Sequence, residues 1–423
     1  MNKTVETFGK IVEDNIDTSP GFARGLLKAG FSFTGLQFKY RPNKKLPPSK
    51  QYAASVCMDA LLQPLKKPEK SAIVNIFLPC EMLHITGTKP LVAEQVSCYT
   101  AGAASEQGML KASEGAGVPP TMCSYHRILT GAAFSGILGR PRFIANTTMV
   151  CDANINTFRF LADHYDVPHF TVDTPMSSSP EAVHYVADQL RQLKKDMEDA
   201  TEVTISEEEL KKRVKLSEES VKLYGECLEA MRNKYVSTDL TSEMYSILMG
   251  HSLLGTGQAK TFYRKLLEDC REAPAYRGRN RIMWMHTIPN CQNSMCDIFN
   301  YSEKNQMLVS DLTTDYLDAP TDDDPYVSMA NRLQFNTFNS TFEVRGRRAI
   351  QTARQLNANG IILFTHWGCR GTAGGVRIME DMAREEGVPL LVLDGDGCDL
   401  KNINEGQMVT RVEAFLEMLE ETK

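Results

Sequence analysis

Short apolar runs alternate along this chain with segments that have the spacing of a helix. Residues 73–78 and 360–365 are mostly apolar, as expected for strands buried on both faces of a parallel sheet. Comparable runs recur at 143–150 and 389–393, and a helix-spaced segment follows each of the four. Such alternation is typical of α/β folds. The predicted fold class is α/β, with two doubly wound parallel-sheet domains of the flavodoxin-like or Rossmann-like kind.

Changes in this pattern predict four parts of the chain. They are an N-terminal helical segment at 1–68, a first α/β domain at 69–178, a helical connector at 179–278 and a second α/β domain at 279–423. The connector is rich in Lys and Glu, with apolar residues at helical intervals, so we expect solvated helices there. Ser179 and Ser206 each precede such a helix, and both are predicted to be N-caps.

Composition limits the partners. The 423 residues carry a formal charge of −6, and the basic residues form no continuous run, so we expect no nucleic acid partner. The apolar runs are much shorter than a membrane-spanning helix, and the polar start of the chain lacks the apolar region of a signal peptide. We therefore expect a cytoplasmic protein without membrane contact.

Cysteines supply the candidate chemistry. In a reducing compartment the eleven cysteines are expected to be thiols or metal ligands rather than disulfides. No Cys-x-x-Cys pair occurs, so any metal cluster would draw its ligands from distant segments. Cys80, Cys123 and Cys369 each lie near the end of a predicted strand or the start of a helix, where backbone N–H groups favour an anionic centre. These three cysteines suggest one inorganic cluster in a cleft between the two domains.

Five segments occur in a characteristic order: LPCEMLH at 78–84, CSYHR at 123–127, VCDAN at 150–154, THWGC at 365–369 and LDGDGCD at 393–399. In this order and company they resemble the 2-hydroxyacyl-CoA dehydratase family. That family also includes benzoyl-CoA reductase subunits and single-chain reductases with a double-cubane cluster. The resemblance covers about residues 70–420 and is weaker in the helical middle.

The resemblance implies a [4Fe-4S] cluster held by three cysteines, with the fourth iron position open. Cys80, Cys123 and Cys369 match that pattern, although many relatives have a cysteine where this chain has Asn75. It also implies a lyase that dehydrates a 2-hydroxyacyl-CoA through a ketyl radical anion. The electron would come from a separate ATP-hydrolysing iron–sulfur activator, and the chain would form a homo- or heterodimer with a related subunit. The chain has no nucleotide-binding Gly-x-x-x-x-Gly-Lys-Ser/Thr loop of its own.

The surplus of cysteines keeps a second function open. Cys98, Cys151 and either Cys291 or Cys296 could complete the six ligands of a double-cubane [8Fe-9S] cluster. Such a centre would suit an oxidoreductase that drives reduction of small molecules with ATP. A third alternative is a non-catalytic electron-transfer protein, which would need the thiols but no substrate cavity.

Other residues near the predicted ligands are candidates for supporting roles. His126 and His366 could donate hydrogen bonds to cluster sulfurs or protonate a leaving hydroxyl, and a purely structural role is equally compatible with the sequence. Glu81 could be a base or an anchor. The remaining candidates are glycines whose backbone N–H groups could reach a cluster sulfide or a thioester oxygen; these are Gly371, Gly374 and Gly375.

Overall fold

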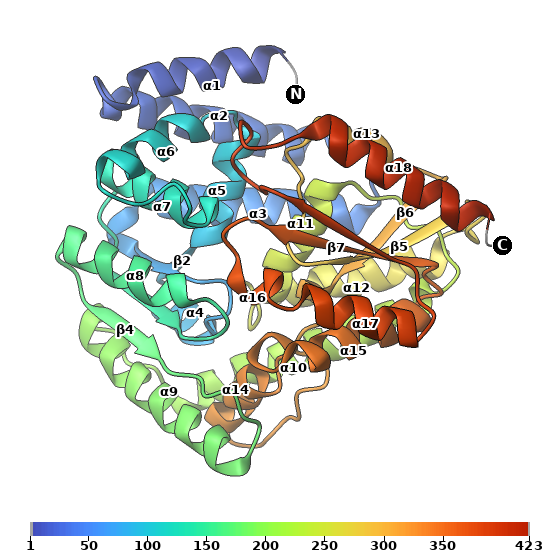
Figure 1. Ribbon diagram of the computed structural model, residues 1–423. Helices are drawn as coiled ribbons and strands as arrows, with labels where there is room; N and C mark the ends of the chain where they lie inside the picture. The colour runs from blue at the N-terminus through green and yellow to red at the C-terminus, as the bar shows by residue number, and fades with distance from the viewer. Residues whose placement is uncertain (1–2, 422–423) are drawn as a thin grey trace.

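Two parallel sheets of four strands each form the centre of the computed structural model, which describes residues 3–421 (Figure 1). The first has the order β2-β1-β3-β4 and the second the order β6-β5-β7-β8. The strands are β1 Ser71–Val74, β2 Lys89–Val92, β3 Phe143–Thr147, β4 His169–Val172, β5 Asn280–Met285, β6 Asn305–Ser310, β7 Gly360–His366 and β8 Leu390–Gly395. Helices flank both sheets, which confirms the predicted α/β class with two doubly wound parallel sheets.

The helices fall into four groups along the chain. Before β1 lie α1 Lys3–Ile16, α2 Pro20–Tyr40 and α3 Pro48–Lys66. The first sheet is accompanied by α4 Glu81–Thr86, α5 Ala93–Gly102, α6 Glu106–Gly115, α7 Ser124–Phe134 and α8 Asp152–Tyr165, and the segment between the sheets forms α9 Pro180–Thr201, α10 Glu207–Met231, α11 Leu240–Gly250 and α12 Gly257–Glu272. The second sheet is accompanied by α13 Asn293–Phe299, α14 Pro325–Gln334, α15 Phe342–Gln355, α16 Arg370–Ala373, α17 Val376–Glu385 and α18 Glu405–Glu421. Both predicted caps are confirmed: Ser179 accepts from the Ala182 N–H at 3.3 Å, and Ser206 accepts from the Glu209 N–H at 3.1 Å.

Side chains of the second sheet alternate between two apolar layers. Met283, Met285 and Leu363 pack with residues of α15 and α17 on one face. Trp284 and Phe364 belong to the larger core on the other face, where α13 and α18 pack. Because neighbouring residues of a strand point to opposite faces, the continuous apolar runs of β5 and β7 follow from burial on both sides.

The first strand is shorter than the sequence predicts. β1 ends at Val74, and the next residue, Asn75, uses its side chain in place of strand pairing. Its Oδ1 accepts from the Thr147 N–H at 3.1 Å, and its Nδ2 donates to the Thr147 hydroxyl at 3.0 Å. The apolar residues Ile76 and Phe77 therefore lie in the turn beyond the strand, where they line a cavity.

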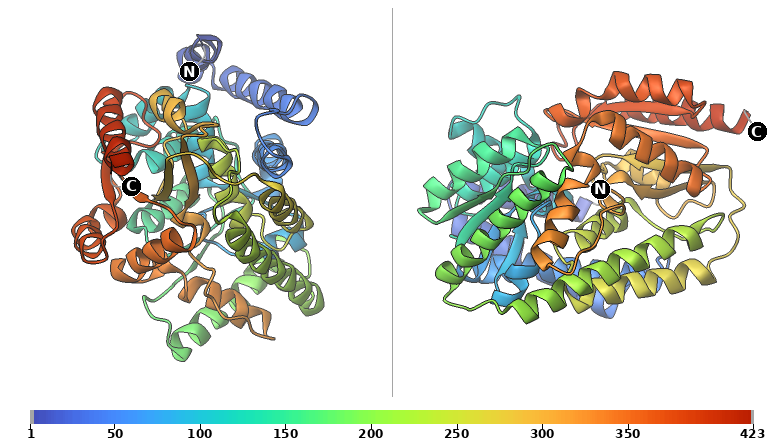
Figure 2. Two further views of the ribbon diagram at one scale, coloured as in Figure 1. Left: turned by 90° about the vertical axis from the view of Figure 1, so that its right-hand side faces the viewer. Right: turned by 90° about the horizontal axis from the view of Figure 1, so that it is seen from below.

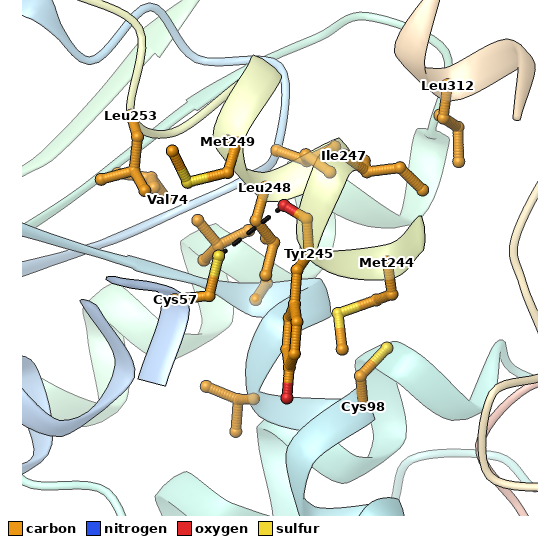
Figure 3. Close-up of a cluster of buried hydrophobic side chains, with 14 of the residues drawn as sticks. Cys57, Val74, Cys98, Met244, Tyr245, Ile247, Leu248, Met249, Leu253 and Leu312 are labelled. Atoms are coloured by element: carbon orange, nitrogen blue, oxygen red, sulfur yellow. Dashed lines mark hydrogen bonds between the residues drawn. The ribbon is translucent and has the colours of Figure 1, made fainter. Parts of the chain in front are cut away.

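The two sheets lie in two lobes that are seen side by side from below (Figure 2, right). Met244, Ile247 and Leu248 of α11 line the cavity at the strand ends. Figure 3 shows these three side chains in a buried cluster that also contains Cys57 and Cys98. No helix within residues 3–421 has both the length and the apolar character needed to cross a membrane.

Candidate metal centre

Turns at the carboxyl ends of strands from both sheets surround one mostly apolar cavity of about 130 Å³. Ile76 lines it from the turn after β1, Cys151 from the turn after β3, His286 from the end of β5 and Cys369 from the turn after β7. Ligands of doubly wound α/β proteins bind at such strand ends. The cavity is therefore the candidate functional site of the chain.

Four cysteines line this cavity, and one of them, Cys98, lies within α5. The other three lie in turns that lead into helices: Cys123 directly precedes α7, Cys151 precedes α8 and Cys369 precedes α16. Burial, with the nearby Cys151 and Cys369, raises the pKa of Cys123 well above its usual value. Burial also raises the pKa of Cys151 to about 12. The thiols of Cys123 and Cys151 become thiolates at neutral pH only if a strong positive charge enters the cavity, which a metal cluster supplies. The donor set therefore fits an iron–sulfur cluster.

Cys80 is not part of this group, in contrast to the expectation from the sequence. It is 1% exposed, its Sγ donates to the Leu78 carbonyl at 3.2 Å, and it does not line the cavity. The reason is the early end of β1: the turn at 75–80 carries Cys80 past the strand end to the start of α4. Cys151, which the sequence assigned only to a second cubane, lines the cavity with Cys123 and Cys369, as was expected of Cys80.

Unusual backbone conformations hold two of the three cysteine turns. Val150, directly before Cys151, has φ +66°, a conformation that β-branched residues rarely adopt. Gly368, directly before Cys369, has φ +80°, and a Cβ there would lie 2.7 Å from the Cys123 backbone nitrogen. Only glycine permits this close approach between the β7 turn and the start of α7. Such strain is concentrated at functional sites.

His366 and His126 each contact one of the three thiols. The Gly397 N–H donates to His366 Nδ1 at 3.0 Å, so the ring proton of the neutral imidazole is on Nε2, which lies 3.2 Å from Cys123 Sγ. His126 Nε2 lies 3.4 Å from Cys151 Sγ. Burial and the nearby His366 lower the pKa of His126 to about 4. Burial also lowers the pKa of His366, so both histidines are neutral at pH 7 and placed to donate hydrogen bonds to these two sulfurs.

Glu81 does not line the cavity. Its Oε1 accepts from the Ser217 hydroxyl at 2.6 Å and from Arg332 Nη2 at 2.6 Å. Burial alone would raise the pKa of Glu81, but Arg332 and the Ser217 hydrogen bond outweigh it and lower that pKa. Of the two roles considered from the sequence, these contacts favour the anchor, which ties α4 to α10 and α14.

The glycines of the β7 turn pack against protein rather than facing the cavity. A Cβ on Gly375 would lie 2.0 Å from the Phe342 ring, one on Gly371 would lie 3.2 Å from Val150 Cγ1, and one on Gly374 would lie 3.1 Å from the Arg370 carbonyl. None of the three lines the cavity. Close packing of the turn accounts for the three glycines, while the binding role of their N–H groups stays a prediction; the glycine that approaches a cysteine is Gly368.

A second group of thiols lies beside the first. The Cys291 Sγ is 3.7 Å from the Cys98 carbonyl. The pKa of Cys398 is raised well above its usual value by burial and by the nearby thiols of Cys98 and Cys291. Cys98, Cys291 and Cys398 are therefore close neighbours. Cys98 also lines the cavity, whereas Cys296 does not and lies 3.4 Å from the Asn290 carbonyl. The sequence did not single out Cys398 as a ligand.

Sequence reasoning also missed three polar residues of the cavity wall. Glu94 Oε2, Asn154 Oδ1 and both ring nitrogens of His286 are buried without a hydrogen-bond partner among the described residues. Burial raises the pKa of Glu94 to about 7. His286 was a detectable candidate, because it ends an apolar strand in the same way as His366.

Within residues 3–421, no set of three or more His, Cys, Asp or Glu side chains has the geometry to hold a single metal ion. That geometry requires ligands around one point at about 2.0–2.3 Å. An iron–sulfur cluster instead binds each cysteine to a different iron atom, so its ligands surround a larger volume. The cavity between the three thiols provides such a volume.

Comparison with known proteins identifies the family of the chain. Residues 75–419 match the family model described as 2-hydroxyglutaryl-CoA dehydratase, D-component. The chain is also similar to the (R)-phenyllactyl-CoA dehydratase alpha subunit of Clostridium sporogenes, with 20% identity over 384 residues, which cover 85% of this chain and 91% of the relative. The matched region contains every strand except β1, together with every cysteine that lines the cavity. The chain belongs to the family of 2-hydroxyacyl-CoA dehydratase components represented by the 2-hydroxyglutaryl-CoA dehydratase D-component.

Proposed function

We propose that this chain is the iron–sulfur component of a 2-hydroxyacyl-CoA dehydratase, with Cys123, Cys151 and Cys369 as the three ligands of a [4Fe-4S] cluster. The observation that carries the proposal is that these thiols, from three different turns, line one apolar cavity at the strand ends. Family membership supports the reaction class. When bound, such a cluster would supply a low-potential electron and a Lewis-acidic iron for radical dehydration of the thioester.

The residues around the cavity would prepare this site in distinct ways. His366 and His126 would donate hydrogen bonds to the ligand sulfurs of Cys123 and Cys151 and lower the charge density there. Apolar side chains such as Phe77 and Ile247 would exclude water, which protects a reactive radical from side reactions. The Glu94 carboxyl, whose Oε2 has no partner among the described residues, would be available to exchange a proton with the substrate.

Two protein partners belong to the proposal. The similar protein from Clostridium sporogenes is an alpha subunit, so we propose that this chain pairs with a related subunit or with a second copy of itself. We also propose an ATP-hydrolysing iron–sulfur activator as electron donor, since the chain has no phosphate-binding loop of the Gly-x-x-x-x-Gly-Lys-Ser/Thr type.

The purified protein is expected to dehydrate 2-hydroxyacyl-CoA substrates only after activation. An ordinary side chain cannot remove the weakly acidic β-proton, so turnover should require an activator with ATP, or a strong chemical reductant. The assay follows 2-enoyl-CoA formation under anaerobic conditions, with and without ATP. Sustained turnover by the protein and substrate alone would contradict the proposed mechanism.

A double-cubane reductase is the second candidate function, and the adjacent thiols of Cys98, Cys291 and Cys398 favour it. With the cavity thiols they make six cysteines in two neighbouring groups. Under this alternative, Cys398→Ala would remove about half of the iron, because a double-cubane centre needs both groups as ligands. Under the single-cubane proposal the same variant would keep all of its iron, because Cys398 would then be a buried packing residue.

A further inference from the structure

His286 differs from the other two histidines of the cavity in having no partner for its ring. It is 9% exposed and lines the cavity, and neither Nδ1 nor Nε2 has a hydrogen-bond partner among the described residues. His126 and His366, by contrast, each have a ring nitrogen within 3.4 Å of a thiol. Buried polar groups without partners carry a desolvation penalty and are rare in folded proteins. Because both unpartnered nitrogens belong to a ring that lines the cavity, they point to a ligand that binds there.

The backbone of His286 is held in a strained conformation by a buried network. Its φ is +76°, a region that non-glycine residues seldom occupy. The His286 N–H donates to Asp311 Oδ1 at 2.7 Å, and its carbonyl accepts from the Ser310 hydroxyl at 3.1 Å. These bonds fix the direction in which the imidazole leaves β5. Strain that is maintained in this way is characteristic of functional positions.

The same network reaches the turn that carries Cys369. Asp311 Oδ2 accepts from Arg345 Nε at 2.8 Å, and Arg345 Nη1 donates to the Thr372 hydroxyl at 3.2 Å. Thr372 Oγ1 in turn lies 3.7 Å from Cys369 Sγ. One buried ion pair therefore fixes both the His286 backbone and the turn of a proposed ligand, which holds the imidazole at a constant place relative to the thiols.

The imidazole of His286 is uncharged at neutral pH. Burial, together with the positive charge of Arg345 and the nearby His366, lowers the pKa of His286 well below its usual value. A neutral imidazole carries one N–H donor and one acceptor nitrogen. Both are unused by the protein, so the ring can donate to an oxygen atom in the cavity without introducing a charge next to the thiols.

We propose that His286 is a catalytic residue that donates a hydrogen bond to the thioester carbonyl oxygen of the substrate. The inference rests on the proposed function and goes beyond it by assigning the substrate contact. A thioester gains negative charge on that oxygen when it receives an electron, and a fixed N–H donor stabilises developing charge most effectively in a cavity without water. Both ring nitrogens of His366 are already engaged, and His126 uses its Nε2 at the Cys151 thiol, so only His286 has both ring nitrogens free for this contact among the described residues.

The test compares His286→Asn and His286→Gly with the wild-type protein. Asparagine and glycine tolerate positive φ better than other residues, so both changes remove the imidazole with little added strain. Turnover is expected to fall by about 10²–10³-fold, mainly in kcat, because the hydrogen bond strengthens as charge develops. Iron content and the electron paramagnetic resonance spectrum without substrate are expected to match the wild type. His184→Asn on the exposed side of α9 is the matched control and should behave as the wild type.

Several outcomes would overturn the assignment. Wild-type kcat in both His286 variants would exclude the contact, and loss of iron in either variant would show that the residue supports the cluster rather than the substrate. If the wild-type protein binds iron and dehydrates its substrate, and both His286 variants keep the wild-type kcat, the role of His286 is excluded but the proposed function stands. If the wild-type protein bound no iron, the proposed function would fail and this inference with it.

Discussion

Cys151→Ala is expected to abolish iron binding, while Cys80→Ala is expected to leave the iron content unchanged. Cys151 lines the cavity with Cys123 and Cys369, whereas the Cys80 thiol is buried away from it and donates to a backbone carbonyl. A cubane that loses one of three protein ligands should be lost during purification. Cys151 is partly exposed in a turn, so its removal should cost little packing. Iron and acid-labile sulfide per chain, after anaerobic purification, measure the effect.

Two further variants serve as positive controls. Cys123→Ala and Cys369→Ala should lose iron to the same extent as Cys151→Ala, with thermal unfolding close to that of the wild type. Full iron content in the Cys151 variant would remove it from the ligand set. Iron loss in the Cys80 variant, with the fold intact, would restore the ligand that the sequence resemblance favoured.

Arg345→Met is expected to destabilise the protein by about 3–5 kcal/mol, because it leaves the buried Asp311 carboxylate without its partner. The side chains of this pair are only 3% and 4% exposed. Arg348→Met on the same helix is the matched control: its pair with Asp318 is much more exposed, at 18% and 69%, and should contribute only about 0–1 kcal/mol. Urea unfolding followed by circular dichroism measures both variants.

The double variant Arg345→Met with Asp311→Leu should recover part of the lost stability, because no unpaired charge remains in the core. Its kcat should remain low, since the His286 N–H has lost its acceptor. Equal unfolding midpoints for Arg345→Met and Arg348→Met would show that the buried ion pair does not hold the β5 and β6 ends in place.

Local sequence patterns were sufficient to predict the architecture. The strands of a parallel sheet are buried on both faces, so the runs that became β5 and β7 are recognisable without any tertiary information. Ser179 and Ser206 could be assigned as caps because capping depends on residues within one helical turn. The helices α14 and α15 between β6 and β7 were not predicted, since their apolar residues are few.

The site could be predicted only in part, because its members are selected by contacts between distant segments. Nothing near Cys80 in the sequence reveals that Asn75 bonds to Thr147 and ends β1 early. With β1 ended there, Cys80 lies at the start of α4 and does not line the cavity, whereas Cys151 does. The same holds for the neighbours of Cys98: the sequence suggested Cys151 with either Cys291 or Cys296, and the structure brings Cys291 and Cys398 to it.

The most direct test of the proposed metal centre is the amount of iron and sulfide bound to the wild-type protein. Protein produced with an active iron–sulfur assembly system and purified without oxygen should contain about four iron and four sulfide ions per chain, as expected for one [4Fe-4S] cluster. After reduction it should give an electron paramagnetic resonance signal that changes when a 2-hydroxyacyl-CoA is added. A folded protein with less than about one iron per chain, and no such signal after cluster reconstitution, would contradict the assignment of Cys123, Cys151 and Cys369 as a cluster site.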